Sequence, residues 1–498
     1  MAYAGSPPLR TAVLALGLAG WSSFPLAAQP AEDAAQRSAR ANALVQAGKP
    51  EAAIAIYKEL VAAFPAEPSF GTNLAIAQYK AGRYQDAILE CRRLLRLRPD
   101  LFPALLFLGA SQLKLGDASS AIGPLRQALS INPNDLNARI MLADSLLANR
   151  QPREAAGEYE LAAGAMPDSP RVWYGLHRGY ADWASEVLST LERTTPESPE
   201  FLALSADFER DRLQFARAFQ LFREALALQP AFRGLHAKVA EIYELTAHPE
   251  WAATESARES APSCGKQSPE CDFLSGRLRE AAAATTTTPD RLYWQGLAIR
   301  ALAQHAYERL GQLPPSRESY EAAAESHEAS ARYREAAAAW KQALSIAPGD
   351  SGIQRRLALA LCYGNDCGSA LPLLKDLLAR TPSSAELNYL CGLALNSIRE
   401  PAQALLYLEK AVRLDGKFLP SHAALGEALL ESGSPEQAIP QLEAAVAEDE
   451  DGVRHFQLAR AYQAAGKREQ AAAVLREYKE ILSRRAASER DEPHITAP

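Results

Sequence analysis

The sequence has little that would suit a nucleic-acid-binding protein or a β-sheet protein. Its net charge is only −7 over 498 residues, whereas nucleic-acid binding selects a basic surface. β-branched residues are sparse and alanine and leucine are abundant, in a composition that is 48% hydrophobic and 23% charged. Because alanine and leucine favour helices and β-branched residues favour strands, the composition predicts an α-helical protein with no nucleic-acid partner.

Recognisable catalytic motifs are also missing. Neither Gly466–Lys467 nor Gly265–Lys266 has the upstream glycine and the following hydroxyl residue of a phosphate-binding loop. There is no His-Glu-x-x-His zinc motif and no Gly-x-Ser-x-Gly nucleophile motif, and the eight histidines are scattered singly. We therefore expect no catalytic residue, no metal and no cofactor.

A long apolar run occurs only near the N-terminus. Arg10 precedes an apolar stretch from Thr11 to Gly20, and the small residues Ala27 and Ala28 stand before a polar, acidic segment. This order is typical of a secretory signal peptide, which we place at residues 1–28. The alternative is an uncleaved anchor, for which the stretch is short, because a membrane span needs about 20 apolar residues. The pattern predicts an exported protein, periplasmic or secreted, with no later transmembrane segment.

What the sequence does contain is a series of prolines at constant spacing. The interval is 34 residues from Pro65 through Pro99 and Pro133 to Pro167, and it recurs from Pro196 to Pro230 and from Pro348 to Pro382. Alanines keep the same register, twelve residues before most of these prolines and then onward past the last one: Ala53, Ala87, Ala121, Ala155, Ala218, Ala336, Ala370, Ala404, Ala438 and Ala471. An internal period of this length indicates stacked helical repeats.

One copy shows the helical pattern inside each repeat. A first stripe at intervals of three and four residues precedes a Gly116–Asp117 turn, and a second stripe follows it; the stripes are Leu105, Leu108, Gly109 and Gln112, then Ala121, Leu125 and Ala128. Such intervals place each stripe on one face of a helix. The small residues Gly109 and Ala121 allow the two helices to approach closely.

This 34-residue helix–turn–helix resembles the tetratricopeptide repeat. The resemblance is carried best by "PALLFLGASQLKLGDASSAIGPLRQALSINPN" and "SHAALGEALLESGSPEQAIPQLEAAVAEDED", and it extends with gaps from about Ala34 to Leu482. It implies an all-α fold, a right-handed α-solenoid of stacked repeats. It also implies a concave groove, lined by the first helices, that binds peptides or protein partners.

The period is broken in two places. Near residues 171–199 the first helix is clear but the second is shortened, and between 261 and 290 the period is lost, before a single long helix from about Arg291 to Leu313. We therefore predict two arrays joined by an irregular insert. The boundaries are 34–260 for the N-terminal array, 261–290 for the cysteine-containing insert, 291–482 for the C-terminal array and 483–498 for a disordered tail.

The six cysteines fall into two groups. Cys91 and Cys391 lie on helix stripes and are predicted to be small buried hydrophobic residues. Cys264 and Cys271 bracket the insert, and Cys362 and Cys367 flank a turn between helices. In an exported protein, such close pairs are candidate disulfides.

Candidate partner-binding residues lie on first helices. Four carboxylates recur on one helix face at intervals of three, four and three, and equivalent groove positions of nearby copies are acidic or aromatic; these residues are Glu318, Glu321, Glu325, Glu328, Asp207, Glu241, Glu244 and Tyr174. One interpretation is an acidic surface for a basic partner, with Tyr174 as an aromatic anchor. The alternative is a solvated helix face, with the neighbouring aromatics serving as packing.

The function that follows is a non-enzymatic scaffold that binds a protein or peptide outside the cytoplasm. Two alternatives stay open. One is a structural accessory subunit of an envelope machine for secretion, pilus or exopolysaccharide assembly. The other is an enzyme with an unrecognised site near Cys264. The sequence does not identify the partner or the oligomeric state.

Overall fold

The computed structural model describes residues 28–259, 268–285, 288–449, 451–490 and 494–498. In these ranges the chain is built from helices and contains no strand. The chain divides into two compact units, residues 1–145 and 146–498. The predicted signal peptide lies almost wholly outside the described residues.

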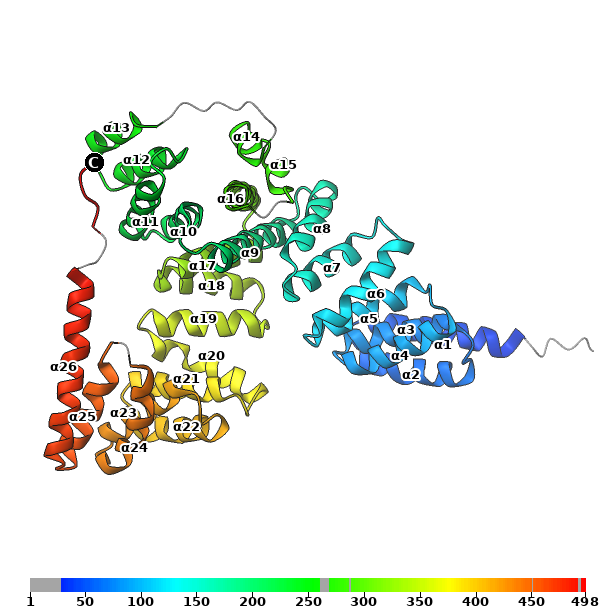
Figure 1. Ribbon diagram of the computed structural model, residues 1–498. Coiled ribbons are helices and arrows are strands. Elements are labelled where there is room, and N and C mark those ends of the chain that lie inside the picture. The colour runs from blue at the N-terminus through cyan, green and yellow to red at the C-terminus, as the bar shows by residue number, and fades with distance from the viewer. Residues whose placement is uncertain (1–27, 260–267, 286–287, 450, 491–493) are drawn as a thin grey trace, which may run out of the picture. The chain divides into compact units, whose positions relative to one another are not determined.

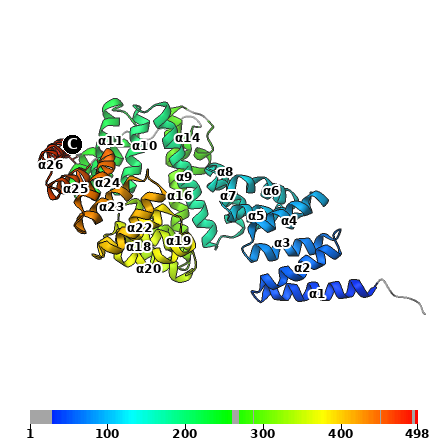
Figure 2. The ribbon, with the colours of Figure 1, turned by 90° about the horizontal axis from the view of Figure 1, so that it is seen from below.

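Unit 1 consists of helical hairpins that follow one another along the chain (Figure 1, Figure 2). Its helices are α1 (Ala28–Gln46), α2 (Pro50–Ala63), α3 (Pro68–Lys80), α4 (Tyr84–Leu97), α5 (Phe102–Lys114), α6 (Ala118–Ile131) and most of α7 (Leu136–Ala148). From α1 to α6 each helix packs on the next one in the chain, and the predicted register alanines Ala53, Ala87 and Ala121 are fully buried.

Unit 2 begins with hairpins and then departs from the repeat. Its first part contains α8 (Pro152–Ala165), α9 (Pro170–Thr194), α10 (Pro199–Asp211), α11 (Phe215–Leu228), α12 (Leu235–Leu245), α13 (Pro249–Ser256), α14 (Pro269–Leu274), α15 (Leu278–Ala282) and α16 (Pro289–Gln312). Its second part contains α17 (Arg317–Ala329), α18 (Tyr333–Ile346), α19 (Ser351–Tyr363), α20 (Cys367–Arg380), α21 (Ala385–Ser397), α22 (Pro401–Leu414), α23 (Leu419–Glu431), α24 (Pro435–Ala445), the 3-10 turn η1 (Val446–Glu448), α25 (Val453–Ala464) and α26 (Arg468–Arg490).

The turn inside each hairpin has one residue in the left-handed backbone region. In several copies this residue is glycine, as at Gly116 and Gly433, with φ of 80° and 76°. In others it is a residue with a side chain, such as Leu213 with φ of 64°. Glycine adopts this conformation without the steric cost that a Cβ atom incurs. The copies with a side chain at this position therefore have a higher conformational energy in the turn than the copies with glycine.

The region around residues 171–199 differs from the prediction of a shortened second helix. Helix α9 is one continuous helix from Pro170 to Thr194, because no glycine or proline interrupts "ADWASEVLSTLERT". The long helix α16 packs along α9 and against α10. At Gly296 of α16, an added Cβ would be 2.9 Å from Leu204 and 3.4 Å from Val187, so the missing side chain permits this close packing.

The boundary between compact units also differs from the predicted division at 261–290. Because α16 follows the insert but packs on α9 and α10, it ties both sides of the insert into unit 2. The tail differs as well. Helix α26 continues to Arg490, since "SRRAASER" holds good helix formers and no breaker, and residues 494–498 contact α12.

Candidate functional site

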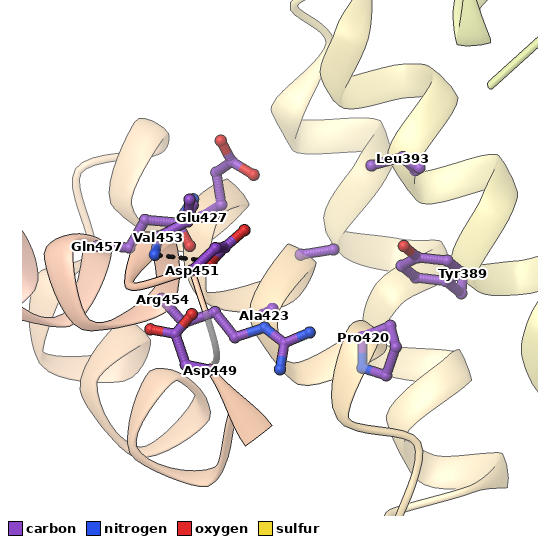
Figure 3. Close-up of a pocket in the computed structure, with 11 residues that line it drawn as sticks. Tyr389, Leu393, Pro420, Ala423, Glu427, Asp449, Asp451, Val453, Arg454 and Gln457 are labelled. Carbon is purple, nitrogen blue, oxygen red and sulfur yellow. Dashed lines mark hydrogen bonds between the residues drawn. The ribbon is translucent and has the colours of Figure 1, made fainter. Parts of the chain in front are cut away.

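Three successive first helices of unit 2 surround a cavity of about 430 Å³. The lining residues come from α21, α23, α25 and the segment before α25 (Figure 3). Several of them occupy equivalent positions in consecutive repeats: Tyr389, Ala423 and Gln457 are spaced by 34 residues, as are Leu393 and Glu427, and Pro420 and Arg454. We call this cavity the α21–α25 pocket.

One side of the α21–α25 pocket is apolar. It is formed by Tyr389 and Leu393 of α21 and by Pro420 of α23, with the small residue Ala423 beside them. The ring of Tyr389 packs edge to face on Phe418, with centroids 5.2 Å apart. Burial raises the pKa of Tyr389, so its hydroxyl stays neutral and can donate or accept a hydrogen bond.

The opposite side carries charge. Figure 3 shows Glu427 and Gln457 there, with the Arg454 side chain extending towards Pro420 and Tyr389. Burial, and to a lesser degree Glu431, raises the pKa of Glu427, while Arg460 and a hydrogen bond with Gln457 act in the other direction. The ionised form of this half-buried carboxyl is stabilised when a cationic group is brought to it.

Two further carboxylates of the pocket shape its wall. Asp449 accepts hydrogen bonds from the backbone N–H of His455 at 2.7 Å and pairs with the Nδ1 atom of the same residue at 2.6 Å. Asp451 accepts one from the backbone N–H of Val453 at 3.0 Å, the bond drawn in Figure 3. Both therefore fix the start of α25 as well as making the pocket acidic.

A second cavity of about 650 Å³ lies between α9, α10, α16, α17 and α19. Its lining mixes cations such as Arg178 and Arg356 with anions such as Asp182 and Glu325. His177 points its Nδ1 atom at the carbonyl of Ala303, 3.0 Å away, and burial lowers the pKa of this imidazole. Charges of both signs balance here, which gives this cavity no evident preference for a cationic or an anionic partner.

The predicted acidic stripe on α17 is not an open acidic surface, and this corrects the expectation. Arg317 lies 3.1 Å from Glu321 and 3.9 Å from Glu318, and Arg356 of α19 pairs with Glu328 and lies 4.0 Å from Glu325. Glu328 also accepts a hydrogen bond of 2.7 Å from the Trp340 indole. Arg317 lies one helical turn before Glu321, and Arg356 comes from the next repeat. The spacing of the carboxylates alone does not predict that these arginines neutralise them.

Asp207 is likewise not available to a partner, because its side chain is fully buried. It pairs with Lys238 and lies 3.3 Å from Arg210 and 3.5 Å from Arg300. Although burial opposes ionisation, these three cations hold the pKa of Asp207 below its usual value. This cluster joins α10, α12 and α16.

The remaining predicted groove residues have separate environments. Glu241 pairs with Arg210 at 2.9 Å, and Glu244 is exposed on α12. Tyr174 is half-buried and forms a hydrogen bond with Glu325 of α17. Its pKa is raised mainly by burial and to a smaller degree by the nearby Glu325 carboxylate. Tyr174 is therefore a contact between α9 and α17 rather than a free aromatic anchor.

The cysteines at positions 91, 391, 362 and 367 have the states predicted for them. Cys362 and Cys367 are joined by a disulfide, while Cys91 and Cys391 are free and buried. Burial raises the pKa of the Cys91 thiol to about 12 and that of Cys391 to about 11, so neither is a reactive thiolate. Cys264 lies outside the described residues, and its pairing with Cys271 stays a prediction.

Sequence reasoning missed the α21–α25 pocket. The signal was present in the 34-residue register that links Tyr389, Ala423 and Gln457. Its acidic residues do not form a stripe on one helix face, because Glu427 lies on α23 whereas Asp449 and Asp451 lie in the segment before α25. Within the described ranges, no helix is long and apolar enough to cross a membrane, and no group of three or more His, Cys, Asp or Glu residues could hold a metal ion.

Comparison with curated proteins finds a partial relative. The Hsp70-Hsp90 organizing protein of Triticum aestivum is 31% identical over 177 residues, which are 35% of this chain and 29% of that protein. The chain thus matches less than a third of that relative's length.

Comparison with solved structures finds helical-repeat proteins. A tetratricopeptide repeat protein from Parabacteroides merdae ATCC 43184 is 14% identical with a TM-score of 0.32, over 66% of this chain and 99% of that chain. MamA protein is 20% identical with a TM-score of 0.30, over 34% of this chain and 94% of that chain.

Family models match both units. Models described as tetratricopeptide repeat match residues 38–102 and 355–417, and residues 112–178. A model of the bacterial transcriptional activator domain matches residues 392–493, which include every lining residue of the α21–α25 pocket except Tyr389. Together with the hairpins and the buried alanine register, these matches show that the chain contains tetratricopeptide repeats.

Proposed function

We propose that the protein is a non-enzymatic scaffold that binds a protein partner in the α21–α25 pocket. The observation that carries the proposal is the register of the pocket: equivalent positions of three consecutive repeats converge on one cavity of about 430 Å³. Successive first helices present such positions as a continuous strip, which suits an extended segment that runs across several repeats.

The chemistry of the pocket favours a segment with one apolar and one basic side chain. Tyr389, Leu393 and Pro420 offer an apolar surface, where aromatic and aliphatic anchors contribute most to affinity. Glu427, Asp449 and Asp451 outnumber Arg454 among the charged lining residues. A lysine or arginine of the partner would therefore find a favourable field beside the apolar anchor.

We also propose that this binding takes place outside the cytoplasm. The basic, apolar and small-residue order of residues 1–28 supports export. The disulfide between Cys362 and Cys367 is consistent with it, because disulfides persist in oxidising compartments and are rare in the cytosol.

Site-specific photo-cross-linking in the source cell tests the proposal. A photoreactive residue at Ala423 in the pocket is compared with one at Leu406, which is 67% exposed on the second helix α22. We expect a discrete adduct at position 423 that maps to one segment of the partner and is absent at position 406. Adducts of equal yield at both positions, or only at position 406, would contradict the proposal.

A further inference from the structure

Among the described residues, the hairpin formed by α12 and α13 ends a run of repeats and no following hairpin packs on it. Helix α13 spans only Pro249–Ser256, eight residues, compared with fourteen in α11. The next described helices, α14 and α15, pack against α16 instead. The end of a repeat array leaves a packing face that needs some cover.

This hairpin carries a compact aromatic cluster. The Tyr243 ring lies 5.4 Å from Phe219 and 5.6 Å from Trp251, and Trp251 stacks on His248 with centroids 4.2 Å apart. Tyr243 is nevertheless fully buried, although it lies in α12 at the end of the run. Part of its environment therefore comes from outside the hairpin.

The chain's own C-terminal residues supply a contact there. The Tyr243 hydroxyl donates a hydrogen bond of 2.6 Å to the backbone carbonyl of Thr496, across 253 positions of sequence. Ile495 is half-buried, whereas its neighbours in residues 494–498 are exposed. Figure 1 shows the C-terminus beside α12 and α13, beyond the end of α26. A main-chain hydrogen bond next to one covered aliphatic side chain is how an extended peptide is held on a protein surface.

We propose that the α12–α13 hairpin is a peptide-binding surface whose occupant is the chain's own C-terminal segment, His494–Pro498. Tyr243 recognises the main chain at Thr496, and the surface around it takes the Ile495 side chain. The surface is separate from the α21–α25 pocket and does not depend on it. A segment held by few contacts is released readily, so a partner that binds the hairpin or the segment would open this link between the α12–α13 hairpin and the C-terminal segment.

Two measurements on one pair of proteins test the proposal: the full chain and a chain that ends at Pro493. The first is amide hydrogen exchange over α12 and α13, which we expect to become faster when the segment is removed. The second is fluorescence anisotropy with a labelled EPHITAP peptide. We expect the shortened chain to bind this peptide and the full chain, whose surface is occupied, to bind it at least about fivefold more weakly.

Variants separate specific docking from general loosening. Tyr243→Phe keeps the packed ring and removes the donor, and it should weaken peptide binding by about fivefold, the usual value of one such hydrogen bond. An Ile495→Asp peptide should not bind. Unchanged exchange together with no peptide binding would overturn the proposal, and so would equal binding of a scrambled peptide. A dimer of the full chain that disappears on truncation would place the segment on a second copy and overturn its assignment to the same chain.

Discussion

Gly109 of α5 lies against Leu125 of α6, and a Cβ atom at position 109 would be 2.5 Å from the Leu125 Cγ atom. Gly426 has the same relationship with Leu442 in a distant repeat, also at 2.5 Å. The absent side chain lets the two helices of a hairpin approach until the leucine is fully buried. This contact explains why the repeat needs glycine at a helix-interior position that otherwise disfavours it.

The first prediction concerns this contact. Gly109→Ala should destabilise the protein by about 1–3 kcal/mol, because the leucine has no room to move in a packed interior. Gly123→Ala is the matched control: this glycine also lies in a helix, α6, but its Cβ would meet nothing within 4 Å. It should be neutral or stabilising by up to about 1 kcal/mol. Urea denaturation of both variants measures the difference, and equal stabilities would argue against the close contact.

The second prediction concerns the strained turn at Leu213. This residue has φ of 64° and is 47% exposed. Leu213→Gly should raise the free energy of unfolding by roughly 0.5–1 kcal/mol. Glycine removes the steric penalty that a side chain incurs in the left-handed region, and this gain exceeds the conformational entropy that glycine adds to the unfolded chain. Leu228→Gly changes a similarly exposed leucine at the end of α11 and should instead lower stability by about 1 kcal/mol. Thermal unfolding of both variants distinguishes the two; a loss of stability at both positions would contradict the strain.

The third prediction concerns the pH dependence of Glu321. Burial raises its pKa to about 7, with nearby Glu318, Glu325 and Asp350 adding to the effect and Arg317 opposing it. The pKa of this carboxyl is about 4.5 in the unfolded chain and about 7 in the folded protein. Its contribution to stability is therefore fully present below pH 4.5 and is lost as the pH rises through about 7.

Replacement of this carboxyl should therefore act only at higher pH. Glu321→Gln should stabilise the protein at pH 8 by on the order of 1 kcal/mol and have little effect at pH 5. Unfolding temperatures of the parent and the variant at the two pH values measure this. A variant that is less stable than the parent at pH 8 would show that the pairing with Arg317 outweighs the burial of the charge.

The fourth prediction concerns the bond between Cys362 and Cys367. Non-reducing peptide mapping of the protein purified without reductant should recover these two residues in one linked peptide. Because the closed loop is short, reduction should lower stability by no more than about 2 kcal/mol. The Cys362→Ser/Cys367→Ser variant should lack this part of the loss of stability on reduction. Two free thiols at these positions in the protein purified without reductant would contradict the pairing.

The repeat could be predicted from sequence because its determinants are local. The prolines, the alanine register and the glycine at position 109 act within one hairpin or between adjacent ones, so spacing alone reveals them. The 34-residue period does not predict the continuous helix α9, because residues 181–194 contain no glycine or proline that would make a turn.

The environments of the candidate partner-binding residues depend on contacts between repeats, which the spacing of residues in the sequence does not reveal. Arg356 neutralises the α17 carboxylates from the next repeat, and Arg300 of the irregular helix α16 reaches Asp207. Their partners are 28 and 93 positions away in sequence. The α21–α25 pocket draws residues from three repeats; the 34-residue register shows which positions are equivalent but not that they line one cavity.

The most direct test of the account is the affinity of a partner segment, identified by cross-linking at position 423, for two charge-reversal variants. Glu427→Lys changes the pocket, and Glu409→Lys makes the same change at an exposed position of α22. We predict that Glu427→Lys weakens binding by about tenfold or more at low salt, while Glu409→Lys leaves it within about twofold. Equal effects of the two variants, or no effect of Glu427→Lys, would contradict binding in the α21–α25 pocket.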